Sequence, residues 1–160
     1  MLEQFRLISK ERRWRESADI LLAKKPTDSA VEAFCTFWIE GGHHLRDQLG
    51  NDRTLVHLLR HMLPPYQGGA VEVFRGENKQ RWQAGRIGLA WSPKVEVGRM
   101  FAGGLNAVNS GGVLLVATAN PDAIISGPVG HSRYLGEDQF TLDPSLLLNI
   151  SATEHFPVAH

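Results

Sequence analysis

The sequence predicts an α+β protein, and three observations support this. Apolar residues recur at helical spacing through the first 65 positions. After Pro65 the content of glycine and β-branched residues rises, and short apolar or alternating runs replace the helical pattern. Helices therefore come before strands instead of alternating with them, which is typical of the α+β class. We expect a single domain over residues 1–160, in which the helical part (1–65) packs on the sheet.

The helices are predicted from apolar stripes and from the residues that interrupt them. Two series fit the first helical stretch: Leu2, Phe5 and Ile8, then Trp14, Ala18, Leu21 and Leu22. A break at Pro26-Thr27-Asp28 precedes a second stripe, formed by Val31, Phe34, Cys35, Trp38 and Ile39. Gly41-Gly42 interrupts or ends that helix. A third stripe, formed by Leu55, Leu58, Leu59 and Met62, stops before Pro64-Pro65.

The rest of the chain predicts short strands and one helix. The strand candidates are Val71–Arg75, Leu89–Ser92, Val113–Thr118 (central), Ala123–Ser126, Gln139–Asp143 and Leu146–Ile150. A helix is expected over Val95–Ala102, with Val97, Met100 and Phe101 on one face and Gly103-Gly104 at its end. Ser92-Pro93 would be its N-cap and first turn. A glycine-rich loop is expected from Gly127 to Gly136.

Composition and charge exclude several classes of protein. Seventeen Lys and Arg balance seventeen Asp and Glu, which argues against binding nucleic acid through bulk charge. No apolar run reaches the length of about 18 residues that a membrane helix needs. The charged N-terminus does not resemble a signal peptide. We therefore expect a cytoplasmic protein without a membrane partner.

The histidines and the cysteine point to no metal centre. His57 and His61 are one helical turn apart, but no carboxylate lies between them, so we expect a solvated polar face. His43-His44 fits a surface or capping pair. Cys35 lies on an apolar stripe, which favours a buried structural thiol. As the only cysteine it excludes an intrachain disulfide.

Common catalytic and nucleotide-binding motifs are missing from the sequence. His131-Ser132 lies in the glycine-rich loop without the Gly-x-Ser-x-Gly elbow of a serine hydrolase. No Gly-x-Gly-x-x-Gly or P-loop string occurs, which argues against Rossmann or P-loop nucleotide binding. Three other segments remain as candidates: Val73-Phe-Arg75-Gly76, Ala90-Trp-Ser92-Pro93 with the helix that follows, and Tyr134-Leu-Gly-Glu137-Asp-Gln139-Phe.

The order of these three segments resembles the Arg-Ser-Glu class of ADP-ribosyltransferases. An arginine, a serine and a glutamate each lie at a predicted strand end, 17 and then 45 residues apart. The resemblance covers about residues 70–150. It implies a small split antiparallel β-sandwich, with the N-terminal helices as an extension packed on it.

The resemblance also implies an activity and roles for particular residues. Such enzymes cleave the nicotinamide–ribose bond of NAD and transfer ADP-ribose to an acceptor. Arg75, a permanent cation with a planar donor fork, would bind the NAD phosphates or the adjacent ribose. Gly76 would let the backbone approach nicotinamide. The remaining implied roles are NAD contact by Trp91 and Phe101, orientation by Ser92, and acceptor recognition by Arg133 and Tyr134.

The acidic motif departs from the family's pattern. In the register that aligns Phe140 with the family's apolar strand, Gln139 takes the place of the catalytic glutamate and Glu137 the accessory place. On a strand, both side chains would face one side, so Glu137 could be catalytic through a shift of two residues. The alternative is a weak or inactive relative that still binds NAD or a protein partner.

These considerations favour an NAD-dependent mono-ADP-ribosyltransferase, with a protein acceptor expected and nucleic acid left open. A small chain of this kind would suit an intracellular, toxin-like effector. Two alternatives stay open: an NAD-binding or interaction module on the same fold, and an adaptor domain of unrelated fold.

Overall fold

The computed structural model describes residues 1–159, and these form two compact units. The first unit is Met1–Pro65 and the second begins at Tyr66, where the sequence pattern changes from helical to strand-like. The class is α+β, with N-terminal helices followed by two small three-stranded antiparallel sheets. Among the described residues, none of the helices combines the length and the apolar character that crossing a membrane requires.

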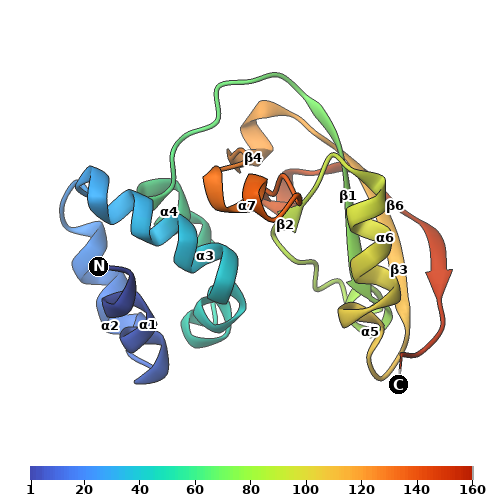
Figure 1. The fold of residues 1–160 in the computed structure, drawn as a ribbon, viewed down its shortest axis with the longest axis horizontal. Helices are drawn as coiled ribbons and strands as arrows, with labels where there is room; N and C mark the ends of the chain where they lie inside the picture. Colours follow the sequence, from blue (N-terminus) through green and yellow to red (C-terminus); the bar gives the residue numbers. More distant parts are fainter. Residues whose placement is uncertain (160) are drawn as a thin grey trace. The chain divides into compact units, whose positions relative to one another are not determined.

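The first unit consists of four helices, which Figure 1 shows in blue to blue-green. They are α1 (Leu2–Lys10), α2 (Trp14–Leu22), α3 (Asp28–Leu49) and α4 (Asp52–Met62). Thr27 caps α3, because its hydroxyl accepts a hydrogen bond of 3.1 Å from the Ala30 amide. Gly41 (φ −136°, ψ 18°) interrupts α3 without ending it. Helix α4 ends before Pro64, as predicted.

Aromatic side chains fill the core of the helical unit. The rings in mutual contact are Phe5, Trp14, Phe34 and Phe37. Cys35 is buried as predicted, and the loss of solvent raises the pKa of its thiol to about 11. His57 is exposed, but the expectation of a solvated face was wrong for His61. Its Nε2 lies 2.9 and 2.8 Å from the carbonyl oxygens of Leu21 and Lys24, so the ring fastens the end of α2.

The second unit contains both sheets. The first sheet has the order β1-β3-β6, with β1 (Val71–Asn78), β3 (Gly112–Ala119) and β6 (Leu148–Phe156). The second has the order β2-β5-β4, with β2 (Ala90–Trp91), β5 (Phe140–Leu142) and β4 (Ile124–Ser126). The strand over 113–118 is central in its sheet, as predicted. Strands β1 and β6 run further than the apolar pattern indicated.

Within residues 1–159, one backbone bridge joins the two sheets. The Phe74 amide donates to the Ser92 carbonyl (2.7 Å), and the Ser92 amide donates to the Phe74 carbonyl (2.9 Å). Because Phe74 belongs to β1 and Ser92 follows β2, the strands form one series, β4-β5-β2-β1-β3-β6. Buried residues of both sheets form one core: Val73, Trp91, Val113, Leu115, Ala117, Ala119, Ile124, Phe140 and Leu142.

Helix α6 (Val95–Gly103) lies along β1 and β3 (Figure 1). Its buried residues are the small Gly98 and Ala102, while Met100, expected on an apolar face, is 57% exposed. Small residues face the sheet because β1 and the helix backbone approach closely. A Cβ added at Gly76 would lie 2.2 Å from the Ala102 nitrogen. The predicted N-cap was wrong by two residues, since Lys94 occupies that position.

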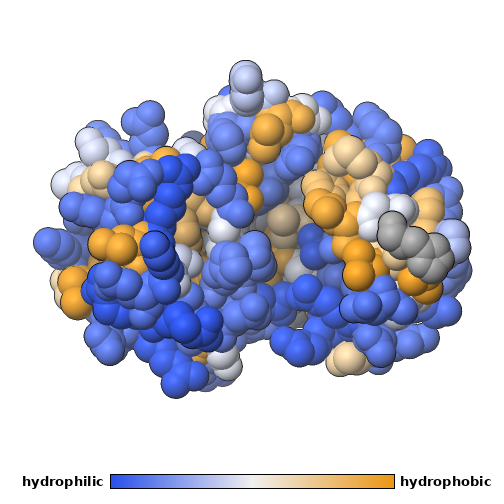
Figure 2. Space-filling model, turned by 60° about the horizontal axis from the view of Figure 1, so that its bottom comes forward, coloured by the Kyte–Doolittle hydropathy of each residue, from blue (hydrophilic) through white to orange (hydrophobic). Residues whose placement is uncertain are grey.

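Several short elements were not expected from the sequence. They are α5 (Lys79–Gln83), α7 (Gly130–Tyr134) inside the glycine-rich segment, and three short 3₁₀ turns at Leu105–Ala107, Pro121–Ala123 and Pro144–Leu146. Hydrophilic residues cover most of the surface in Figure 2, with apolar residues showing in patches between them. The exposed apolar side chains of the second unit include Met100, Leu105, Val108 and Tyr134.

Candidate functional site

Ser92 connects three segments that are distant in the sequence. Its backbone bridges to Phe74, the neighbour of Arg75. Its hydroxyl donates a 2.7 Å hydrogen bond to the main-chain carbonyl of Glu137 and accepts one of 3.1 Å from the Lys94 amide. Ser92 is 3% exposed, so these bonds lie away from solvent. The arginine, serine and glutamate segments therefore meet at this residue.

Lys94 holds the same acidic segment from a second direction. Its Nζ lies 2.9 Å from Oδ2 of Asp138 and donates to the Gly136 carbonyl at 3.1 Å. Both charged side chains are partly exposed, so the ion pair by itself stabilises little. Together, Ser92 and Lys94 fasten three consecutive residues, Gly136 to Asp138, to the turn that leads into α6.

The acidic motif does not form the expected strand. Strand β5 begins at Phe140, and Asp138 has a left-handed backbone (φ 44°). The alternation that would put Glu137 and Gln139 on one side requires extended backbone, so that expectation was wrong at Asp138. Both Glu137 and Gln139 are half-buried. Gln139 directly precedes Phe140, which pairs with Trp91, so it is next to Ser92 in register.

Arg75 is held tightly by its own chain. Its Nε donates to Oε2 of Glu77 (2.8 Å), and its Nη1 donates to the carbonyl of Ala90 (2.8 Å). The guanidinium lies against Gly88, where an added Cβ would be 2.1 Å from Nη2. Only 16% of the Arg75 side chain is exposed. Arg75 thus connects β1 to β2 on the other side of the strand from Phe74.

Glu77 is a charged residue of this region that the sequence did not single out. Its side chain is completely buried and accepts from the amides of Gly88 and Asn78, each at 2.9 Å, as well as from Arg75. Burial alone would raise its pKa, but the charge and hydrogen bond of Arg75 and the two amides outweigh it and hold the pKa below its usual range. If the predicted strand had been extended to position 77, its alternation would have placed Glu77 on the same face as Val71, Val73 and Arg75. That pattern could have revealed Glu77.

The other predicted residues have varied surroundings. Gly76 lies under α6, and the Asn106 side chain donates to its carbonyl (2.6 Å). Trp91 is buried in the core, with its indole N–H donating to Gly88 (2.9 Å). Phe101 is half-buried on α6. On α7, Arg133 is exposed and Tyr134 is 86% exposed, which leaves both side chains accessible to a macromolecule.

Direct bonds connect some of the predicted residues and leave others separate. Ser92 is bonded to Glu137, and Arg75 is bonded to the strand that precedes Ser92. Within residues 1–159, no hydrogen bond or ion pair joins Arg75 to Glu137 or Gln139. Over the same residues, no three His, Cys, Asp or Glu side chains form a group that could hold a metal ion.

Comparisons with models of protein families, with curated proteins and with solved structures find no match.

Proposed function

We propose that this protein is an NAD-dependent mono-ADP-ribosyltransferase on a fold of the ADP-ribosyltransferase type. The main support is the junction at Ser92. One residue is bonded through its backbone to the neighbour of Arg75 and through its hydroxyl to Glu137. The sequence indicated these three segments by their residue strings and their order along the chain. Two small antiparallel sheets that meet at this junction are consistent with the proposed fold.

The reaction requires charge of both signs around a bent dinucleotide. The bond between nicotinamide and the anomeric carbon breaks, its electron pair leaves with neutral nicotinamide, and positive charge develops on the ribose. A nucleophile of the acceptor then bonds to that carbon and gives up a proton. A carboxylate near the ribose stabilises the developing charge, and cations hold the diphosphate.

The chain offers residues for each of these tasks. Arg75 supplies a fixed cation whose remaining N–H groups suit a diphosphate. Glu137 supplies the carboxylate, and Ser92 fixes the backbone that carries it. Gln139 can hydrogen-bond a ribose hydroxyl. Exposed Arg133 and Tyr134 on α7, a few residues before Glu137, suit contact with the acceptor.

A second candidate function is NAD or protein binding without turnover. Two points favour it: in the register proposed from the sequence, Gln139 takes the place of the family's catalytic glutamate, and Arg75 is already ion-paired with Glu77. Such a protein would bind NAD and leave it intact.

A transfer assay distinguishes the two functions. The protein is incubated with NAD labelled in the adenylate part, alone and with protein and nucleic acid acceptors. Transfer of label to an acceptor or to the protein itself would support the transferase. Calorimetric binding of NAD with no cleavage would favour the binding module. Absence of both binding and transfer would overturn both.

A further inference from the structure

Glu77 has a role in the proposed site that the motif order does not indicate. It is the last charged residue of β1, and no part of its side chain is exposed. A buried carboxylate persists only where several donors compensate its lost hydration. Here the donors are Nε of Arg75 and the amides of Asn78 and Gly88, and Nε of Arg81 lies 3.8 Å away.

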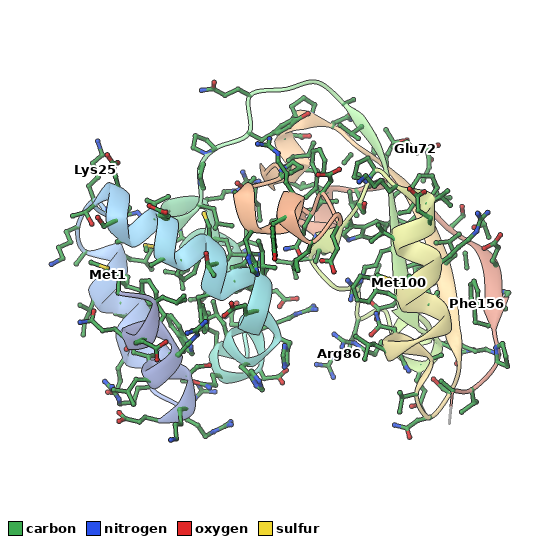
Figure 3. The ribbon with its side chains drawn as sticks, in the orientation of Figure 1. Met1, Lys25, Glu72, Arg86, Met100 and Phe156 are labelled. Carbon is green, nitrogen blue, oxygen red and sulfur yellow. The ribbon has the colours of Figure 1, made fainter. Side chains whose placement is uncertain are left out.

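The charges around Glu77 do not cancel. Two arginines share one carboxylate, which leaves one unit of positive charge in the cluster. No Asp or Glu occurs between Glu77 and Glu96, whereas Lys79 and Arg86 add further cations. Arg86 is exposed, and Figure 3 shows its side chain extending away from the ribbon. The region therefore favours an anionic ligand although the whole chain is neutral.

Glu77 also controls the geometry of Arg75. It binds the guanidinium at Nε and binds the Gly88 amide with the same oxygen, Oε2. Gly88 in turn accepts from the Trp91 indole, and its missing side chain leaves the space that Nη2 occupies. One carboxylate thus fixes both the arginine and the segment against which it lies.

We propose that Glu77 is a positioning residue that locks the Arg75 guanidinium in the orientation needed to bind the diphosphate of NAD. This role rests on the proposed function. A locked planar fork loses little conformational freedom when a diphosphate binds to the N–H groups that Glu77 and Ala90 do not occupy. Without Glu77, Arg75 would remain a cation, but its guanidinium would no longer be held in one orientation.

The test compares NAD binding by the full chain with that of Glu77→Gln, using calorimetry and the NMR signal of the Arg75 Nε–H group. Glu154→Gln is the matched control, because it makes the same chemical change in the exposed pair between Arg99 and Glu154. We expect Glu77→Gln to weaken NAD binding by about tenfold or more and to shift the Arg75 signal. The control should stay within about twofold of wild type.

A mutant cycle separates positioning from general destabilisation. If Glu77 acts through Arg75, Glu77→Gln should weaken NAD binding much less in an Arg75→Lys background, whereas a purely structural effect would be equal in both. Should Glu77→Gln fail to fold, Gly88→Ala displaces the guanidinium while keeping the carboxylate, and we expect the same loss of affinity. Wild type that binds NAD, beside a folded variant that binds it equally well, would overturn only the positioning role. Wild type that does not bind NAD would overturn the proposed function as well.

Discussion

The hydroxyl of Ser92 donates a 2.7 Å hydrogen bond to the main-chain carbonyl of Glu137, 45 residues further along the chain. The bond goes to the main chain, so it fixes the backbone at Glu137. It does not involve the Glu137 carboxylate. The same hydroxyl accepts from the Lys94 amide. A single buried side chain thereby joins the start of α6 to the acidic segment.

Replacing Ser92 by alanine should loosen this junction. The Glu137 carbonyl and the Lys94 amide would both lose their partner at a buried position. We expect a loss of about 1–3 kcal/mol in the free energy of unfolding and faster hydrogen exchange of the Lys94 amide. Ser145→Ala, which removes an exposed hydroxyl bonded to Asp143, is the control. Unchanged exchange at Lys94 in a stable Ser92→Ala protein would contradict the role given to this bond.

The roles of Glu137 and Gln139 can be separated by three variants. Glu137→Ala removes the carboxylate and leaves the main-chain bond to Ser92 intact. We expect it to lower the rate of nicotinamide release by about 10²–10³-fold, the usual loss of a well-placed electrostatic group. Gln139→Ala should cost much less, and Gln139→Glu should retain or increase the rate. A severe loss in Gln139→Ala beside an active Glu137→Ala would reverse the assignment.

Gly76→Ala should destabilise the second unit. An added Cβ would lie 2.2 Å from the Ala102 nitrogen and 2.3 Å from the Gly98 oxygen, both backbone atoms of α6. The helix would have to move away from β1, which we expect to cost about 1–3 kcal/mol in the free energy of unfolding. Denaturant titration measures this. Gly69→Ala, where nothing lies within 4 Å, is the control. Equal stability of the two variants would show that α6 does not pack on β1 as described.

The buried carboxylate of Glu77 should make stability depend on acid pH. Its pKa is lower in the folded protein than in the unfolded chain, so its contribution is complete above about pH 4.3, the ordinary value for glutamate. The contribution is lost as the pH falls through the lower, folded pKa. The charged groups that face the carboxylate are Arg75 and Arg81. Urea titrations should therefore show the stability gap between wild type and Glu77→Gln shrinking as the pH falls below about 4. A gap that does not change with pH would contradict this.

The helices and most strands could be predicted because local signals determine them. Prolines end α4, the Thr27 hydroxyl caps α3, and the apolar run at 113–118 forms the central strand. The N-cap of α6 was misplaced because the chain is still extended at Lys94 (φ −97°, ψ 113°), which the Ser-Pro pair did not reveal. Helix α7 was missed because its glycine-rich composition indicates a loop.

The candidate site was only partly visible in the sequence. Motif order brought out Arg75, Ser92 and Glu137, of which Ser92 and Glu137 are directly bonded. Glu77 was overlooked because the predicted strand stopped at Arg75, and its donor at Gly88 comes from the irregular segment before β2, whose position depends on the tertiary fold. The left-handed backbone of Asp138 is another tertiary feature, since Lys94 and Ser92 hold that segment.

The most direct test of the proposed function is release of nicotinamide from NAD by the purified wild-type chain. It should be followed over time with and without protein and nucleic acid acceptors. We expect release that increases in proportion to protein concentration and falls strongly in Glu137→Ala. Release at the rate of the buffer with every acceptor, by a protein shown to be folded, would contradict the proposed transferase.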